Sequence, residues 1–356
     1  MRGIDKQTGR LYQRVVGLRG MNAASPSRSL PDGESPGIYG ALLSTGSIVP
    51  AKVKGDAAFT SPPFTEPIRL AFVGEFDAPI IILMGTQKCW VQSSGAPTPK
   101  TPDPVFSGVA GAFRMWDGFT MLHSGAPVAV VNNRGADRPH YWDGGDGVFL
   151  PLSDAPTMRC CIGYLGRLVG GSVTPGETEL INRLQWSTEG NITVYAGTTS
   201  GYLDMKDRGD RILRMGLLRG HQLLILRQET TYIGYPTLIP GNPIATSHLA
   251  QRGIFARQSL QELENAYIFM GKDDIYLADA TGVVPIGWKI RKPLFRDATP
   301  STLDRAWSFT DKRAKNYYLV VAVSGGAVAW IYNWEEKAWT WQDLSGYTTL
   351  ATWRKD

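Results

Sequence analysis

Short apolar runs recur along this chain, and each is followed by a polar turn and a second run that contains an aromatic residue. The two clearest examples follow one another. In the first, residues 223–226 precede a turn and residues 231–235; in the second, residues 266–270 precede a turn and residues 275–278. An apolar run, a tight polar turn and another strand-like run are typical of a hairpin between buried strands.

Six apolar runs of this kind divide most of the chain into similar units. They lie at residues 79–84, 127–131, 167–169, 223–226, 267–270 and 317–322. A period of roughly 40 to 50 residues with several short strands in each unit predicts a β-propeller. We predict six or seven blades, and the six runs favour six. A two-sheet sandwich would also have short strands, but it gives no reason for six similar units.

The composition supports an all-β protein. The chain has 356 residues, with 40 Gly, 23 Pro, 11 Trp and 14 Tyr, so turn formers and strand-favouring aromatics are both abundant. Only residues 259–264 and 202–214 have spacing that suggests a helix. In the apolar runs, we expect Leu224, Ile225, Phe269 and Val320 to be buried, because alternate residues of each strand would pack against the next blade.

The first part of the chain differs from the repeats. Residues 1–66 are rich in Pro and Gly, which favours extended segments and turns, whereas residues 67–356 carry the propeller pattern. Residues 1–66 are either a disordered tail or an arm that becomes ordered on a partner, and their apolar content favours the arm. We also expect long loops at residues 93–104 and 235–243; the second has three prolines and should project from an edge.

The charge pattern is mild, at a formal +5 with a pI near 9.0. Two groups of basic residues could meet phosphates, but solvated faces and protected strand edges are the favoured interpretation. These groups are Lys289, Arg291 and Lys292, and Lys312, Arg313 and Lys315.

No cofactor or metal site is expected. Cys89, Cys160 and Cys161 are an odd number of cysteines without a CxxC motif, so we expect buried free thiols in a reducing compartment. The four histidines are isolated in sequence. The N-terminus lacks the apolar core of a signal peptide and no run approaches the ~18 residues of a membrane helix, so we expect synthesis in the cytoplasm and no membrane span.

Enzymatic activity is not expected either. Propeller glycosidases place carboxylates roughly 5 to 9 Å apart, and eight acidic residues are candidates for such a pair. They are Asp143, Asp146, Glu189, Asp204, Asp207, Asp273, Asp274 and Asp311. Almost all lie in predicted turns, where Asp is favoured because its side chain bonds to the backbone. No catalytic or nucleotide-binding motif occurs in a suitable context.

The order of features resembles the tail nozzle or hub proteins of short-tailed bacteriophages, which are similar to the packaged-DNA stabilisation proteins of podoviruses. At the N-terminal end, the resemblance rests on residues 17–22, a Pro-Asp-Gly turn at residues 31–33, and residues 48–55. In the blades it rests on residues 164–168, 183–187, 211–213, 223–226, 254 with 259, 267–271 and 274–276.

This resemblance implies a non-enzymatic structural component of the virion tail. It implies a hexameric ring below the portal and adaptor proteins, contacts with tail fibre or needle proteins, and only transient contact with passing DNA. In such a ring, the two basic groups named above should lie on outer or inter-subunit faces. The alternative is a propeller domain that binds or cleaves host-surface glycans.

Overall fold

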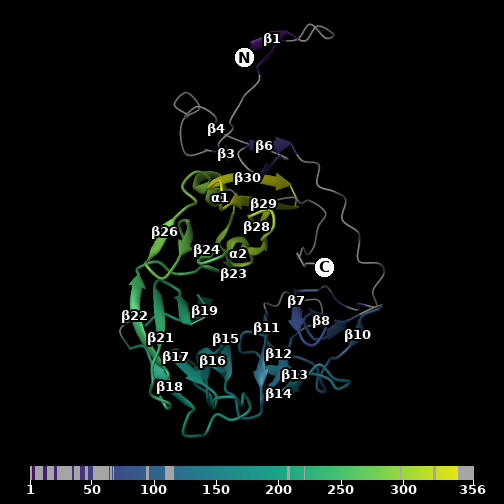
Figure 1. Cartoon of the computed structure of the whole chain (residues 1–356), viewed down its shortest axis with the longest axis vertical. Helices are drawn as coiled ribbons and strands as arrows, with labels where there is room; N and C mark the ends of the chain where they lie inside the picture. Colours follow the sequence, from purple (N-terminus) through teal and green to yellow (C-terminus); the bar gives the residue numbers. More distant parts are fainter. Residues whose placement is uncertain are drawn as a thin grey trace.

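The computed structural model describes residues 64–343, apart from residues 65, 67, 94–95, 109–115, 207–208, 220, 297 and 324–325, together with six short strands before residue 51. Residues 70–343 form six four-stranded antiparallel units around a common centre (Figure 1). The fold is therefore an all-β propeller, and the described part of the chain has six blades, as the apolar runs predicted.

In every blade the strands are adjacent in sequence order. Blade one contains β7 (Leu70–Glu75), β8 (Pro79–Met84), β9 (Cys89–Gln92) and β10 (Thr98–Pro99). Blade two contains β11 (Asp117–His123), β12 (Ala126–Asn132), β13 (His140–Trp142) and β14 (Leu150–Pro151). Blade three contains β15 (Thr157–Tyr164), β16 (Arg167–Thr174), β17 (Leu180–Trp186) and β18 (Gly201–Asp204).

The second half of the ring repeats this order. Blade four contains β19 (Ile212–Leu218), β20 (Gln222–Arg227), β21 (Thr231–Pro236) and β22 (Ile244–Ala250). Blade five contains β23 (Ala256–Glu262), β24 (Tyr267–Met270), β25 (Ile275–Ala278) and β26 (Val283–Pro285). Blade six contains β27 (Trp307–Asp311), β28 (Asn316–Val323), β29 (Gly326–Asn333) and β30 (Ala338–Asp343), and one parallel pairing of Gln258 with Trp307 joins it to blade five.

The first strand of each blade lies nearest the centre. Along the chain, β7, β11, β15, β19, β23 and β27 each contact the next strand of this series (Figure 1). The side chain of Gln258 on β23 donates a hydrogen bond to the carbonyl of Trp116, just before β11, at 2.8 Å. This bond joins the side chain of Gln258 in blade five to the backbone just before blade two, near the centre of the ring.

The second strand of each blade is buried on both faces, as β20 shows. Leu223 and Ile225 pack in a cluster with residues of blade three, whereas Leu224 and Leu226 pack with residues of blade five. Alternate residues point to opposite faces of a strand, so a strand between two other blades must be apolar at every position. This explains the continuous apolar runs. The predicted core residues Leu224, Ile225, Phe269 and Val320 are all buried.

The prediction of helix at residues 259–264 is wrong, because most of that segment belongs to β23. A register shift between Ala256 and Gln261 interrupts its pairing with β24. Inside this bulge, the buried hydroxyl of Ser259 donates to the carbonyl of Ala256 at 2.5 Å and accepts from the amide of Met270 at 2.8 Å. The bulge disturbs the two-residue alternation of a strand and produces a spacing that resembles a helix.

The second predicted helix, at residues 202–214, is also wrong, since the segment includes most of β18 and the start of β19. The helices of the described chain lie instead between β26 and β27. They are α1 (Arg291–Arg296) and α2 (Pro300–Asp304). Thr299 and Thr302 form a capping box at the start of α2, and Pro300 occupies its first turn, where its missing amide costs nothing.

Before the propeller, the described backbone consists of short strands. They are β1 (Arg2–Ile4), β2 (Leu11–Gln13), β3 (Gly20–Met21), β4 (Glu34–Ser35), β5 (Ala41–Ser44) and β6 (Ser47–Pro50). Both β3 and β5 contact β30, the outer strand of blade six. The rest of the predicted arm, residues 1–66, lies almost entirely outside the described residues.

Of the two predicted loops, residues 93–104 contain the short strand β10, and residues 235–243 connect β21 with β22. Within the residues described, no helix has the length and apolar character needed to cross a membrane.

Candidate functional site

Five arginines gather near the centre of the ring, on the side where the first strands begin, and we call them the axial arginine cluster. Arg134 lies in the turn after β12 and Arg159 on β15; Arg211 directly precedes β19, Arg214 lies on β19 and Arg257 on β23. Charges from these separate segments act on one another: Arg159 and Arg211 both lower the pKa of Arg257. The cluster is therefore built by the packing of blades two to five and not by any single segment.

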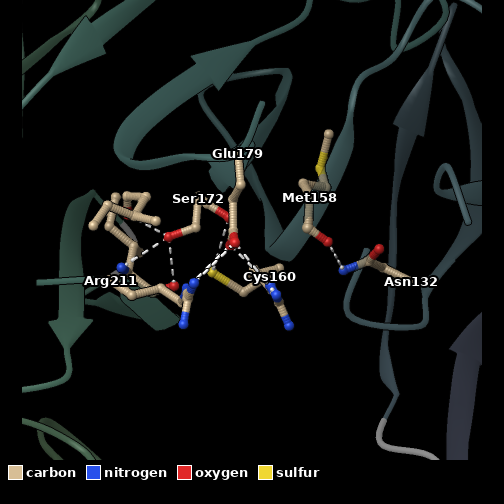
Figure 2. A network of polar contacts seen from close by, with 10 residues as sticks. Asn132, Met158, Cys160, Ser172, Glu179 and Arg211 are labelled. Carbon is tan, nitrogen blue, oxygen red and sulfur yellow. Dashed lines mark hydrogen bonds and ion pairs between the residues drawn. The ribbon is translucent and has the colours of Figure 1, made fainter. Parts of the chain in front are cut away.

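Glu179 holds two of these arginines. Its carboxylate accepts hydrogen bonds from Arg159 at 2.9 and 3.3 Å and from Arg211 at 3.0 and 2.9 Å, each through Nε and Nη2 (Figure 2). Burial raises the pKa of Glu179, but the hydrogen bonds and charges of both arginines together outweigh burial and place the pKa below its ordinary value. Glu179 is thus a carboxylate that clamps blade three to blade four.

A bulge at Ser172, in the strand before Glu179, helps to hold blade three against blade four. At Ser172 the pairing of β16 with β17 shifts register, and Ser172 has a positive φ of 51°. Its hydroxyl accepts from the amide of Ile212 at 2.9 Å and donates to the carbonyl of Ile181, so it ties this bulge to β19 (Figure 2). A Cβ at Gly171 would lie 2.7 Å from Ile212, so only glycine allows this close approach. Beneath the arginines, burial raises the pKa of the Cys160 thiol to about 12, which leaves it protonated and unreactive.

Arg214 is paired on the other side of the cluster. Its guanidinium forms an ion pair with Asp117, which is 5% exposed at the start of β11 and also accepts from the amide of Cys161 at 3.4 Å. Burial lowers the pKa of Arg214 to about 10, and the charge of Arg257 acts in the same direction. This pair joins blade two to blade four.

The remaining two arginines, Arg134 and Arg257, both have lowered pKa values. Burial is the main cause that lowers the pKa of Arg134 to about 9, and the charge of Arg257 is the next. Burial likewise lowers the pKa of Arg257 to about 10. The charge of Asp304 on α2 raises this pKa but does not outweigh burial. The Nη1 atom of Arg257 is buried and has no hydrogen-bond partner among the described residues. Among the described contacts, Glu179 and Asp117 form ion pairs with three of the five arginines, and the charge of Asp304 acts on Arg134 and Arg257.

The acidic residues considered from sequence do not meet in one site. Asp143 and Asp311 accept hydrogen bonds from amides within their own turns at 3.0 Å, and Asp273 accepts from the hydroxyl of Tyr276 on β25 at 2.7 Å. Glu189 pairs with Arg167 at 2.7 Å, and Asp204 with Arg183 at 2.6 Å.

Asp146 lies in an exposed turn, Asp274 is buried and accepts from the amide of Ile275 at 2.7 Å, and Asp207 lies outside the described residues. Within the part of the chain that the structure describes, no group of three or more His, Cys, Asp or Glu is placed to hold a metal ion.

The two basic groups predicted from sequence lie away from the axial arginine cluster. Lys289, Arg291 and Lys292 precede or begin α1, and Arg291 lies 3.7 Å from Asp274. Lys312 and Lys315 follow β27 and pair with Glu262 and Glu264; Arg313 is exposed beside them. The three cysteines are free and buried, as predicted.

The loop at residues 235–243 presents a second feature of interest. Leu238 is fully exposed and Ile239 is 60% exposed at its tip. The amide of Thr237 donates to the carbonyl of Pro243 at 2.9 Å, and the amide of Asn242 to that of Ile239 at 3.0 Å. The loop is therefore internally bonded while two adjacent apolar side chains face solvent, as expected of a projecting segment.

Sequence reasoning missed the axial arginine cluster, although a signal existed. Arg159 and Arg214 are each the third residue of their blade's first strand, and Arg257 is the second residue of its own. The repeats were aligned on the apolar second strands, so these equivalent positions were not compared. An alignment on the first strands would have brought the three arginines together.

No family model matches this chain, and no curated protein matches it. Among solved structures, the chain resembles virginiamycin B lyase from Staphylococcus aureus at 12% identity and a TM-score of 0.46, over 78% of this chain and 84% of that one. It also resembles the WD40 domain of Pan2 from Neurospora crassa at 8% identity and a TM-score of 0.42, over 78% and 79% of the two chains. We draw no conclusion about function from either likeness.

Proposed function

We propose that this protein is a non-enzymatic structural subunit of a short bacteriophage tail, of the nozzle or hub type. Copies form a closed homohexameric ring in the virion, below the portal and adaptor proteins and next to the tail fibre or needle proteins, along the path by which DNA leaves. The resemblance noted in sequence, in residues 17–22 and in the blades, supports this role and supplies the sixfold copy number. The six-bladed fold is compatible with it.

The outer edges of blades one, two and five are poorly suited to sheet pairing between copies. The outer strands β10 and β14 have two residues each and β26 has three. Short edge strands limit pairing with another chain. On blade six, the longer outer strand β30 is contacted by β3 and β5. On blade four, however, the outer strand β22 has seven residues. We therefore expect contacts between copies to use loops, the N-terminal segment or this strand, and head-to-tail contacts of this kind end when the rotation closes into a ring.

The observation that carries the proposal is the apolar tip of the loop at residues 235–243. Leu238 and Ile239 are adjacent, exposed, and held on a loop with its own hydrogen bonds. A rigid loop loses little conformational entropy on binding, so a partner that covers both side chains gains most of the burial free energy. This favours a protein-binding role for the loop.

The test replaces both apolar tip residues, as Leu238→Ser with Ile239→Ser. We expect the variant to fold normally but to enter phage particles at a tenth of the wild-type level or less, as measured by quantitative mass spectrometry of purified particles. Leu122→Ser is the matched control, since Leu122 is 61% exposed on β11 and should be replaceable without effect.

Imaging of intact particles provides the second measurement. Six copies around the tail axis would support the proposal, whereas threefold or fivefold copies, or a position outside the tail, would refute it. Turnover or stoichiometric binding of host polysaccharide by the purified protein would favour the glycan-directed alternative instead.

A further inference from the structure

The outer strand of blade four, β22, is the longest outer strand in the described part of the propeller. It has seven residues, whereas β10 and β14 have two each, β26 has three and β18 has four. The six-residue strand β30 is contacted by β3 and β5, but the described contacts of β22 with other strands are chiefly those with β21. An outer strand of this length presents backbone donors and acceptors with which another strand can pair.

The register shows which backbone groups of β22 face away from the sheet. The amide of Thr237 donates to the carbonyl of Pro243 at 2.9 Å, so these two residues are a hydrogen-bonded pair at the start of the ladder between β21 and β22. Bonded and non-bonded pairs alternate along antiparallel strands, so every second residue after Pro243 bonds to β21, and the residues between them direct N–H and C=O outward. The outward-directed residues are Ile244, Thr246 and His248.

The composition of β22 does not protect this edge. Natural edge strands are commonly protected by Lys, by Pro or by a bulge. Residues 244–250 include no Lys, Arg, Asp, Glu or Pro, and the register with β21 is uninterrupted from Ile244 to His248. Ala245, Ser247 and His248 are exposed, so solvent reaches the strand along most of its length.

We propose that β22 pairs with β22 of a second copy of this chain, antiparallel and about a two-fold axis at Thr246. In this register Thr246 lies opposite Thr246 of the second copy, and Ile244 lies opposite His248, so the outward-directed backbone groups of the two strands meet. The two copies of blade four then form one continuous sheet. Such an isologous contact differs from the head-to-tail contacts of the proposed ring, so it does not rest on the tail function.

A second copy fits this edge better than a foreign segment does. Like charges directly opposite each other destabilise a strand pair, whereas a Thr–Thr pair is favourable, and the self-pairing of β22 places Thr246 against itself. The exposed side chains of Ala245 and Ser247 are small and offer little to select a foreign sequence. Ile244 is 1% exposed in the core, so pairing adds backbone hydrogen bonds without disturbing the packing of the blade.

Sedimentation velocity of the full chain over a range of concentrations tests the proposal through charges at the two-fold axis. Thr246→Lys places two ammonium groups opposite each other, and Thr246→Glu places two carboxylates there, so each variant alone should self-associate at least tenfold more weakly. An equal mixture of the two variants pairs opposite charges and should recover the association of the wild type. The matched control is Thr98→Lys, since Thr98 is exposed on the two-residue outer strand β10 and its replacement should change the association less than twofold.

Circular dichroism and thermal unfolding verify that the variants are folded. A wild type that stays monomeric up to about 100 µM, or association that Thr246→Lys leaves unchanged, would overturn the proposal. Loss of association in both charged variants without recovery in the mixture would show that β22 pairs with a different segment, which also refutes the two-fold register. If the wild type forms hexamers, the β22 contact joins two of them and Thr246→Lys should leave single hexamers, so the contact and the proposed ring fail separately.

Discussion

Two arginines from neighbouring blades show how differently the same side chain can be used. Arg227, at the end of β20, is fully buried and forms an ion pair with Asp210. Its Nε and Nη2 atoms also donate to the carbonyl of Asp210 at 3.0 and 2.8 Å. Arg257, on β23, is only partly buried, yet its Nη1 atom has no hydrogen-bond partner and other arginines act on its charge.

The difference teaches that burial alone does not indicate the role of a charged residue. A buried cation whose donors have fixed partners from its own chain stabilises a unique structure, and losing one partner is then expensive. A cation that is surrounded by like charges and incompletely bonded contributes little to stability.

The largest effect should come from Arg227→Met. This change leaves the Asp210 carboxylate buried without its cation, although the hydroxyl of Thr230 still donates to it at 2.9 Å. We expect the free energy of unfolding to fall by about 3 kcal/mol, as measured by urea denaturation. Lys272→Met is the control, because the pair of Lys272 with Glu229 is exposed and should contribute less than about 1 kcal/mol. Equal losses in the two variants would show that the buried pair stabilises the fold no more than the exposed pair does.

An intermediate effect is expected for Glu179→Gln. The two arginines bound to Glu179 are more than a third exposed, so solvent screening reduces the loss at neutral pH to about 1 kcal/mol. Since the native pKa of Glu179 lies below its unfolded value, its contribution is present above the unfolded pKa and is lost as pH falls through the native pKa.

The wild type and Glu179→Gln should therefore begin to converge in stability near pH 4, the ordinary pKa of the unfolded carboxyl, and converge fully only below the lower native pKa. Denaturation at several pH values between 7 and 3 measures this. A difference that stays constant over the whole range would mean that the charge of Glu179 is unimportant.

The smallest effect should come from Arg257→Met. Removing this cation relieves its repulsion with Arg159 and Arg211, which offsets the lost attraction to Asp304. We expect the free energy of unfolding to change by no more than about 0.5 kcal/mol. A loss as large as that expected for Arg227→Met would show that Arg257 is structural, and the contrast between the two arginines would fail.

The sequence was informative where both faces of a strand are buried. The run at residues 223–226 is apolar at every position because it lies between two blades, and the core residues Phe269 and Val320 were identified in the same way. The first strands were harder to recognise, since they face the centre of the ring and carry polar residues or bulges. The helix predicted at residues 259–264 is such a case, where the bulge at Ser259 disturbs the alternation.

The site was less predictable than the fold for a physical reason. Arg134, Arg159, Arg211 and Arg257 come from separate turns and strands, and only the packing of blades two to five brings their charges together. The spacing of residues within one segment does not show which segments will pack together. An alignment of the first strands of the blades is needed to bring Arg159, Arg214 and Arg257 to neighbouring positions. By contrast, the interpretation of acidic residues as turn formers agrees with the bonds of Asp143 and Asp311 within their own turns. The role in a phage tail stays a prediction.

The alternation along β20 has a consequence for how the ring comes apart. Leu223 and Ile225 belong to one apolar cluster, and Leu224 and Leu226 belong to the next. If blade four detached, the clusters on both of its sides would be exposed to water in the same event. Successive blades are thus linked by shared strands, and we expect cooperative unfolding in which no single blade survives as a stable fragment.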